Sequence, residues 1–257
     1  MLILAIDTSG RQGSVALARS DEKSFELIQS VPIQGGTFSA ELVPQIAELL
    51  AQHNLRKEQI DAFAAASGPG SFTGLRVGLA AIKALAEVLE KPIAAVSMLE
   101  AVAATQSDYR DQDLVLPAGL DCLVWEGDAK GNVAAVLDAG RGEVYVGEYS
   151  FGRPLPVLVE EIVVVPQELA RMIEQRGQKL ALITPDQHII DEIKKLLRDP
   201  YVLSARHVEH PGSAGVARLG IAKVLAGKTV GVDELDANYV RRSDAEIFSL
   251  PKILGKS

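Results

Sequence analysis

A glycine-rich loop between an apolar run and a helix-forming run is the feature that most constrains how this chain can fold. The apolar run covers residues 60–66, and the loop follows as Ser67-Gly68-Pro69-Gly70-Ser71-Phe72-Thr73-Gly74. Residues 75–90 then carry good helix formers, with apolar residues at helical spacing. This order predicts a strand, a tight loop and a helix.

Two functions of that loop are open from the sequence. Backbone N–H groups at the start of a helix attract anions, so the loop could cradle a phosphate. Glycines such as Gly70 and Gly74 also allow close packing against another element of the fold. The glycine spacing matches neither the Walker loop nor the dinucleotide-binding fingerprint, so it predicts neither of those functions.

Composition and charge restrict the class of protein. Apolar residues make up 47% of the 257 residues and charged residues 23%, as in globular domains. The single cysteine excludes an internal disulfide, the N-terminal run lacks a signal peptide's basic segment, and no apolar run reaches about 20 residues. We therefore expect a cytoplasmic protein without a membrane segment. Its net charge of −8 argues against RNA binding by its own surface, although not against binding by a complex.

The pattern of the first strands recurs in the second half of the chain. Residues 4–17 and 134–147 each contain an apolar strand that ends in aspartate, a turn with glycine and arginine, and an alternating return strand. Such a repeat predicts two halves of similar build. We place their boundary between residues 106 and 107, where the composition becomes polar. The predicted elements of the first half are strands 2–6, 14–18 and 25–31, helix 40–53, strand 60–66, helix 75–90, strand 92–96 and helix 98–105.

Polar residues end the first strand of each half. Asp7-Thr8-Ser9 and Asp138, together with Gly70 and Ser71 of the glycine loop, are the candidate residues of a nucleotide cleft between the halves. A carboxylate can hold a hydrated divalent ion, and hydroxyl and turn amide groups can hold phosphate. The alternative is an ordinary turn in which the aspartate accepts hydrogen bonds from its own neighbours. The spacing of the four histidines predicts no metal site.

Two helices have apolar residues around more than one face. A helix of this kind is either deeply buried or part of an interface, and the sequence does not decide between these alternatives. The candidate interface residues on helices 40–53 and 75–90 are Leu42, Ile46, Leu49, Leu75, Leu79, Ile82 and Leu85.

Four motifs together resemble the bacterial TsaB (YeaZ) family. They are Ile3-Leu4-Ala5-Ile6-Asp7-Thr8-Ser9, the glycine loop through Arg76, the turn from Asp138 to Tyr145, and Asn238-Tyr239-Val240-Arg241. The resemblance implies an α/β, two-lobed actin-like or sugar-kinase-like (ribonuclease H-like) fold with two related βββαβα halves. It also implies an N-terminal, partner-binding lobe over residues 1–106 and a degenerate second lobe over residues 107–257. We expect the C-terminal helix to pack back on the first lobe, and the tail to do the same or to be partly disordered.

The resemblance further implies a role in forming N6-threonylcarbamoyladenosine in tRNA, as a non-catalytic relative of the catalytic subunit TsaD. In TsaD two histidines of a motif after the same helix bind the metal, and Met98 and Val102 stand at those positions here. A thioether and an isopropyl group do not replace two imidazoles at such a site. We therefore expect no catalytic residue, no metal and no cofactor of its own, with ATP and Mg²⁺ entering only within the complex.

The implied partners are a TsaD-like catalytic subunit and a TsaE-like ATPase, with a homodimer when the chain is alone and tRNA bound only through the complex. The chain departs from the family pattern at Phe38-Ser39, where relatives have His-Ser, and at Gly140, which interrupts Asp-Ala-Arg. Two rival functions are an ATP-dependent phosphotransferase of the same superfamily, built on Asp7 and Asp138, and a metallopeptidase.

Overall fold

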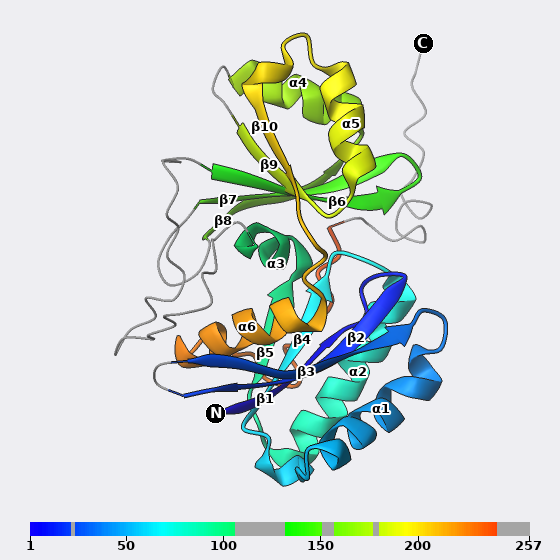
Figure 1. Ribbon diagram of the computed structural model, residues 1–257, viewed down its shortest axis with the longest axis vertical. Coiled ribbons are helices and arrows are strands. Elements are labelled where there is room, and N and C mark those ends of the chain that lie inside the picture. Colours follow the sequence, from blue (N-terminus) through cyan, green and yellow to red (C-terminus); the bar gives the residue numbers. More distant parts are fainter. Residues whose placement is uncertain (22–23, 106–131, 151–156, 177–179, 241–257) are drawn as a thin grey trace, which may run out of the picture.

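The computed structural model describes residues 1–21, 24–105, 132–150, 157–176 and 180–240. Two lobes stand one above the other along the long axis of the molecule, each built on a five-stranded sheet (Figure 1). Predictions that concern residues 107–131 and the tail after residue 240 lie outside the described residues. Among the described helices, none combines the length and the apolar character that a membrane span needs.

The first sheet contains β1 at its centre, where a continuous apolar run is buried on both faces. The strand order is β3-β2-β1-β4-β5, in which β1, β2 and β3 are antiparallel and β1, β4 and β5 are parallel. The strands are β1 (Leu2–Asp7), β2 (Gln12–Ser20), β3 (Phe25–Gln34), β4 (Ala62–Gly68) and β5 (Ile93–Ser97).

The second sheet repeats this topology. Its order is β10-β9-β6-β7-β8, with β6, β7 and β8 antiparallel and β6, β9 and β10 parallel. The strands are β6 (Asn132–Gly140), β7 (Glu143–Ser150), β8 (Val157–Val164), β9 (Leu180–Thr184) and β10 (Leu203–His207). The central strands β1 and β6 therefore correspond, and the predicted α/β fold of two related, ribonuclease H-like halves in an actin-like arrangement is confirmed.

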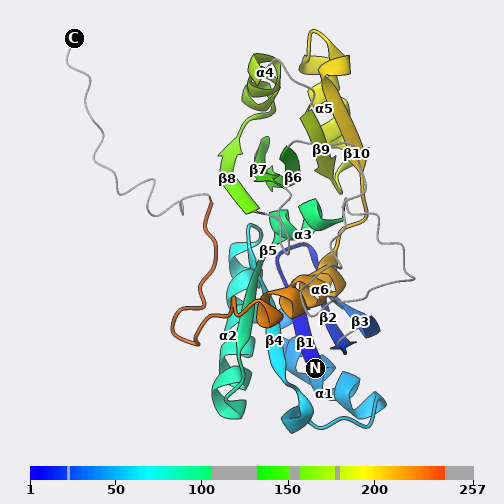
Figure 2. The same cartoon turned by 90° about the vertical axis from the view of Figure 1, so that its left-hand side faces the viewer.

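The helices cover both faces of each sheet. The α-helices are α1 (Phe38–Gln52), α2 (Phe72–Leu89), α3 (Met98–Ala104), α4 (Pro166–Arg176), α5 (Gln187–Leu196) and α6 (Gly212–Leu225), and the short 3-10 helices are η1 (Lys57–Gln59) and η2 (Pro200–Val202). In the first lobe α1 and α2 lie on one face of the sheet and α6 lies on the other (Figures 1 and 2). In the second lobe α4 and α5 lie on the outer face, and α3 packs against β6 and β7 on the face toward the first lobe.

The helices α3 and α6 are thus exchanged between the lobes. Helix α3 follows the last strand of the first sheet but contacts the second, whereas α6 follows the last strand of the second sheet but packs on β1, β2, β4 and β5. The chain after α6 also lies on the first lobe, where the Val230 N–H donates a hydrogen bond to the Ile93 carbonyl over 2.9 Å and Leu235 is buried.

The predicted interface residues are mostly core residues of the first lobe. Helices α1 and α2 contact both the sheet and each other, so each of them buries a wide apolar stripe inside the lobe. Of the two alternatives, burial in the core therefore describes these side chains, and their burial does not support their assignment to a partner interface. The six that are at most 5% exposed are Leu42, Ile46, Leu49, Leu75, Leu79 and Ile82, and Leu85 is half-buried against the same cluster.

Candidate functional site

The turn after β1 closes on itself. The Asp7 carboxylate accepts hydrogen bonds from the Ser9 N–H over 2.9 Å and from the Ser9 hydroxyl over 2.6 Å. Asp7 and Thr8 are each 1% exposed and Ser9 is 6% exposed. The alternative of an ordinary aspartate turn therefore describes this segment.

The glycine loop packs directly on that turn. A Cβ atom on Gly74 would lie 2.1 Å from the Thr8 carbonyl oxygen, and one on Gly70 would lie 2.4 Å from the Ser9 carbonyl oxygen. The Ser71 N–H donates to the same Ser9 oxygen over 2.6 Å, so this amide is already paired. Close packing of α2 on the end of β1 accounts for both glycines.

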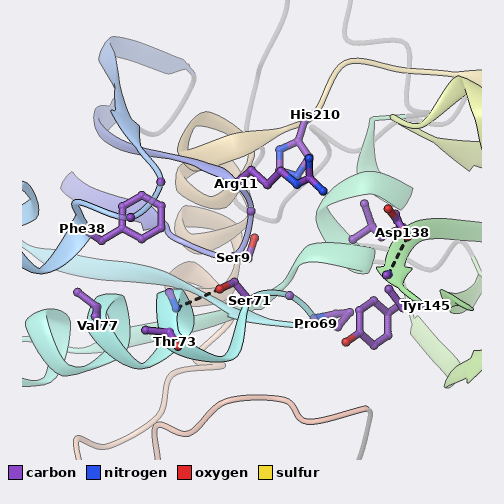
Figure 3. A pocket seen from close by; sticks show the side chains of 18 of the residues that line it. Ser9, Arg11, Phe38, Pro69, Ser71, Thr73, Val77, Asp138, Tyr145 and His210 are labelled. Atoms are coloured by element: carbon purple, nitrogen blue, oxygen red, sulfur yellow. Dashed lines mark hydrogen bonds between the residues drawn. The ribbon is translucent and has the colours of Figure 1, made fainter. Parts of the chain in front are cut away.

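A cleft of about 790 Å³ remains between the lobes. Figure 3 shows Ser9, Arg11 and Ser71 on its first-lobe side, Asp138 and Tyr145 on the second-lobe side, and His210 on the connection from β10 to α6. The structure thus brings most of the predicted cleft residues to one place, although Asp7 and Thr8 lie beneath its surface.

The carboxylates at and beneath the cleft take part in hydrogen bonds within the chain. One oxygen of Asp7 is used by Ser9, and its other oxygen lies 3.9 Å from Nδ1 of His210. Asp138 accepts a hydrogen bond from the Gly140 N–H over 2.7 Å, and its own N–H donates to the Asp186 carboxylate over 3.3 Å. Within the described ranges, no three His, Cys, Asp or Glu side chains are grouped so that they could hold a metal ion.

Helix α3 occupies the seam between the sheets and is buried along its whole length. Met98 and Val102, which the resemblance places at the positions of two metal-binding histidines of TsaD, are both 0% exposed. Glu100 on the same helix forms an ion pair of 2.8 Å with Lys223 of α6. Burial raises the pKa of Glu100, and the ammonium group of Lys223 opposes that rise.

A second carboxylate at the seam joins both lobes and the chain after α6. Glu161 of β8 accepts hydrogen bonds at Oε1 from the Ser97 hydroxyl over 2.6 Å and from the Tyr149 hydroxyl over 2.5 Å. Its Oε2 accepts a hydrogen bond from Nδ2 of Asn238 over 2.5 Å. Burial of Tyr149, with the adjacent Glu161 charge, raises the pKa of the phenol. No local sequence pattern points to this cluster.

The outer face of α2 presents a ridge of exposed residues at every fourth position. Val88 is 72% exposed, and Phe72 is 43% exposed. Val43 of α1, which is 60% exposed, lies on the outer side of the neighbouring helix. The residues that we call the α2 ridge are Phe72, Arg76, Ala80, Ala84 and Val88.

Comparison with known proteins identifies relatives of the whole chain. The family model described as TsaD, tRNA N6-adenosine threonylcarbamoyltransferase, matches residues 35–193. The chain is 28% identical over 251 residues to "tRNA threonylcarbamoyladenosine biosynthesis protein TsaB" of Bacillus subtilis, with 96% of each chain covered. It is 29% identical over 253 residues to the protein of the same name from Escherichia coli, covering 95% of this chain and 96% of that one.

A solved structure supports the fold in the same way. YeaZ from Pseudomonas aeruginosa superposes with a TM-score of 0.66 at 24% identity, covering 93% of this chain and 100% of that one. These similarities confirm the resemblance predicted from the motifs, and they show that the chain belongs to the TsaD family, with TsaB (YeaZ) proteins as relatives over nearly its whole length.

Proposed function

We propose that this chain is a non-catalytic subunit in the formation of N6-threonylcarbamoyladenosine in tRNA, and that it binds and activates a TsaD-like catalytic subunit in the cytoplasm. The names of its relatives support the pathway. The observation that carries the non-catalytic role is the seam at α3. Met98 and Val102 are fully buried there, and neither side chain is a ligand for a hard metal ion.

The surface that contacts the catalytic subunit is the α2 ridge together with the outer face of α1. Ala80 and Ala84 have small side chains, which let a partner helix approach the backbone of α2 closely. Val88 and Val43 supply exposed apolar area beside them. This set replaces the buried leucines and isoleucines that the sequence suggested, because it lies on the opposite side of the same helices.

The rest of the proposed assembly follows the family pattern. A TsaE-like ATPase joins the complex, ATP and Mg²⁺ enter only there, and tRNA contacts this chain only through the complex. Alone, the chain pairs with itself through the α2 ridge. The phosphotransferase alternative has less support, because Asp7 and the amide of Ser71 are already engaged within the chain.

The test is a charged substitution on the ridge. Ala84→Arg should abolish binding to the TsaD-like subunit from the same organism, measured by titration calorimetry and size-exclusion chromatography. It should also convert any homodimer to a monomer. The matched control is Leu225→Arg, which changes a 51% exposed residue at the end of α6 on the opposite face of the sheet and should bind normally. Normal binding by a folded Ala84→Arg protein would exclude this surface.

Activity then tests the role itself. Threonylcarbamoylation of tRNA by the TsaD-like subunit should require this chain and should be lost with Ala84→Arg. Modification that proceeds at the same rate without the chain would overturn the proposed activation.

A further inference from the structure

The segment that follows α6 runs along the first lobe beside α2 and continues toward the second lobe (Figure 2). We call residues 229–240 the strap. Val230 pairs with Ile93 of β5, Leu235 is 1% exposed, and the Asn238 N–H donates to the Ser67 carbonyl at the end of β4 over 2.6 Å. The strap is therefore fixed to the first lobe along its length.

The strap reaches the second lobe at the carboxylate of Glu161. Nδ2 of Asn238 donates to Glu161, whose other oxygen accepts from Ser97 of the first lobe and Tyr149 of the second. An ionised carboxylate accepts hydrogen bonds only, so it satisfies all three donors at once, and hydrogen bonds to a charged acceptor are stronger than neutral ones. This arrangement ties the strap and both sheets to one point.

The next residue of the strap contacts the α2 ridge. The Tyr239 hydroxyl accepts a hydrogen bond from Nε of Arg76 over 3.2 Å, and its ring centroid lies 5.4 Å from that of Phe72. The Arg76 guanidinium lies 3.7 Å over the Phe72 ring. Asn238 and Tyr239 are adjacent, with Cα atoms about 3.8 Å apart. Asn238 therefore contacts the seam between the lobes, and Tyr239 contacts the first turns of the α2 ridge.

We propose that the strap sets the angle between the two lobes through Glu161 and couples that angle to occupancy of the α2 ridge. The second half of this inference rests on the proposed function, whereas the first half does not. A partner that fixes Phe72 and Arg76 also fixes Tyr239, and through Asn238 it stabilises one position of Glu161. Because both lobes line the cleft, its width changes with the same angle. Linkage is reciprocal: if a bound partner favours the closed seam by a given factor, the closed seam raises the affinity for the partner by the same factor. Loosening the seam must therefore weaken partner binding.

The first experiment measures the lobe angle in the free chain. Spin labels at Lys57→Cys and Lys195→Cys, which are exposed positions in the first and second lobes, report the distance across the molecule when Cys122 is replaced by serine. The unaltered strap should give one narrow distance distribution. Glu161→Ala should broaden it, and Asn238→Ala should broaden it less because Ser97 and Tyr149 remain bound.

Glu160→Ala is the matched control, because Glu160 is the exposed neighbour of Glu161 on β8 and should leave the distribution narrow. If Glu161→Ala proves unstable, Glu161→Gln keeps the shape of the side chain and removes the charge, and it should still broaden the distribution. A narrow, unshifted distribution in a folded Glu161 variant overturns the inference.

The second experiment measures affinity for the TsaD-like subunit. Asn238→Ala and Glu161→Ala should each weaken binding by roughly fivefold or more, although neither residue lies on the ridge, and Glu160→Ala should not. If Ala84→Arg abolishes binding while the Asn238 and Glu161 variants bind normally, the coupling is wrong and the proposed function stands. If Ala84→Arg also binds normally, the α2 ridge is excluded as the partner surface, the coupling to it is wrong, and the distance measurement alone decides the role of the strap.

Discussion

The two lobes share a topology but differ at the turn after the central strand. In the first lobe Asp7 is buried, and α2 lies directly over its turn through Gly70 and Gly74. In the second lobe the equivalent Asp138 is exposed and faces the cleft, and the Asp186 carboxylate just before α5 accepts a hydrogen bond from its N–H. Identical strand order therefore does not fix the exposure of this turn, because the helix that follows decides whether the turn is covered.

The largest expected effect concerns the helices that the lobes exchange. Lys223→Met removes the partner of Glu100 and leaves a buried carboxylate, which should destabilise the chain by about 3–5 kcal/mol at neutral pH. Urea unfolding monitored by circular dichroism measures this loss.

The pH dependence identifies the cause. Because burial already raises the pKa of Glu100, the folded variant takes up a proton at a higher pH than the unfolded chain does. Its stability should therefore rise as the pH falls through the folded-state pKa. A loss that is equal at all pH values would contradict the ion-pair explanation. Lys228→Met, at an exposed lysine after α6, is the control and should have little effect.

The next effect compares a glycine where α2 packs on the end of β1, in the first lobe, with a glycine in the β6–β7 turn of the second lobe. Gly74→Ala would place a Cβ atom 2.1 Å from a backbone oxygen, so the helix must move, and we expect a loss of about 3 kcal/mol in unfolding free energy. Gly140→Ala meets no atom within 4 Å and only strains a residue at φ +70°, which should cost about 1 kcal/mol. Equal losses in denaturant unfolding would show that steric packing does not distinguish the two turns.

The centre of the first sheet is predictable from local sequence, because β1 and β4 are short apolar runs that are buried along their whole length. The edge strands β3 and β10 carry many exposed residues, so their local signal is weaker. The repeat is visible because Asp7 and Asp138 end matching strands. The function of the glycine loop is not predictable, because a phosphate cradle and a tight helix junction both require glycine. What separates these alternatives is the 2.1 Å that would lie between a Cβ atom at Gly74 and the Thr8 carbonyl oxygen, because it shows a tight helix junction.

The surfaces and the seam are harder to predict than the strands. An apolar stripe that packs on a sheet and on a second helix has the width of an interface, so the sequence pattern alone does not show that Leu79 and Ile82 are buried. The α2 ridge, by contrast, mixes charged, small and apolar residues, so no hydrophobic pattern in the sequence marks it as a surface. The Glu161 cluster is invisible locally, because Ser97 and Asn238 lie 64 and 77 residues away from it along the chain.

The smallest effect compares the N-cap residues that precede the equivalent helices α2 and α5. The Ser71 hydroxyl accepts a hydrogen bond from the Gly74 N–H over 3.2 Å and so caps α2, whereas Asp186 makes no side-chain cap for α5. Ser71→Ala should therefore cost about 1 kcal/mol of unfolding free energy. Asp186→Ala should cost less, because it removes only the hydrogen bond to the Asp138 N–H at the exposed turn. If thermal unfolding shows a larger loss for Asp186→Ala than for Ser71→Ala, the second-lobe turn is the more tightly held of the two. The contrast between a closed first-lobe turn and an open second-lobe turn would then have to be reversed.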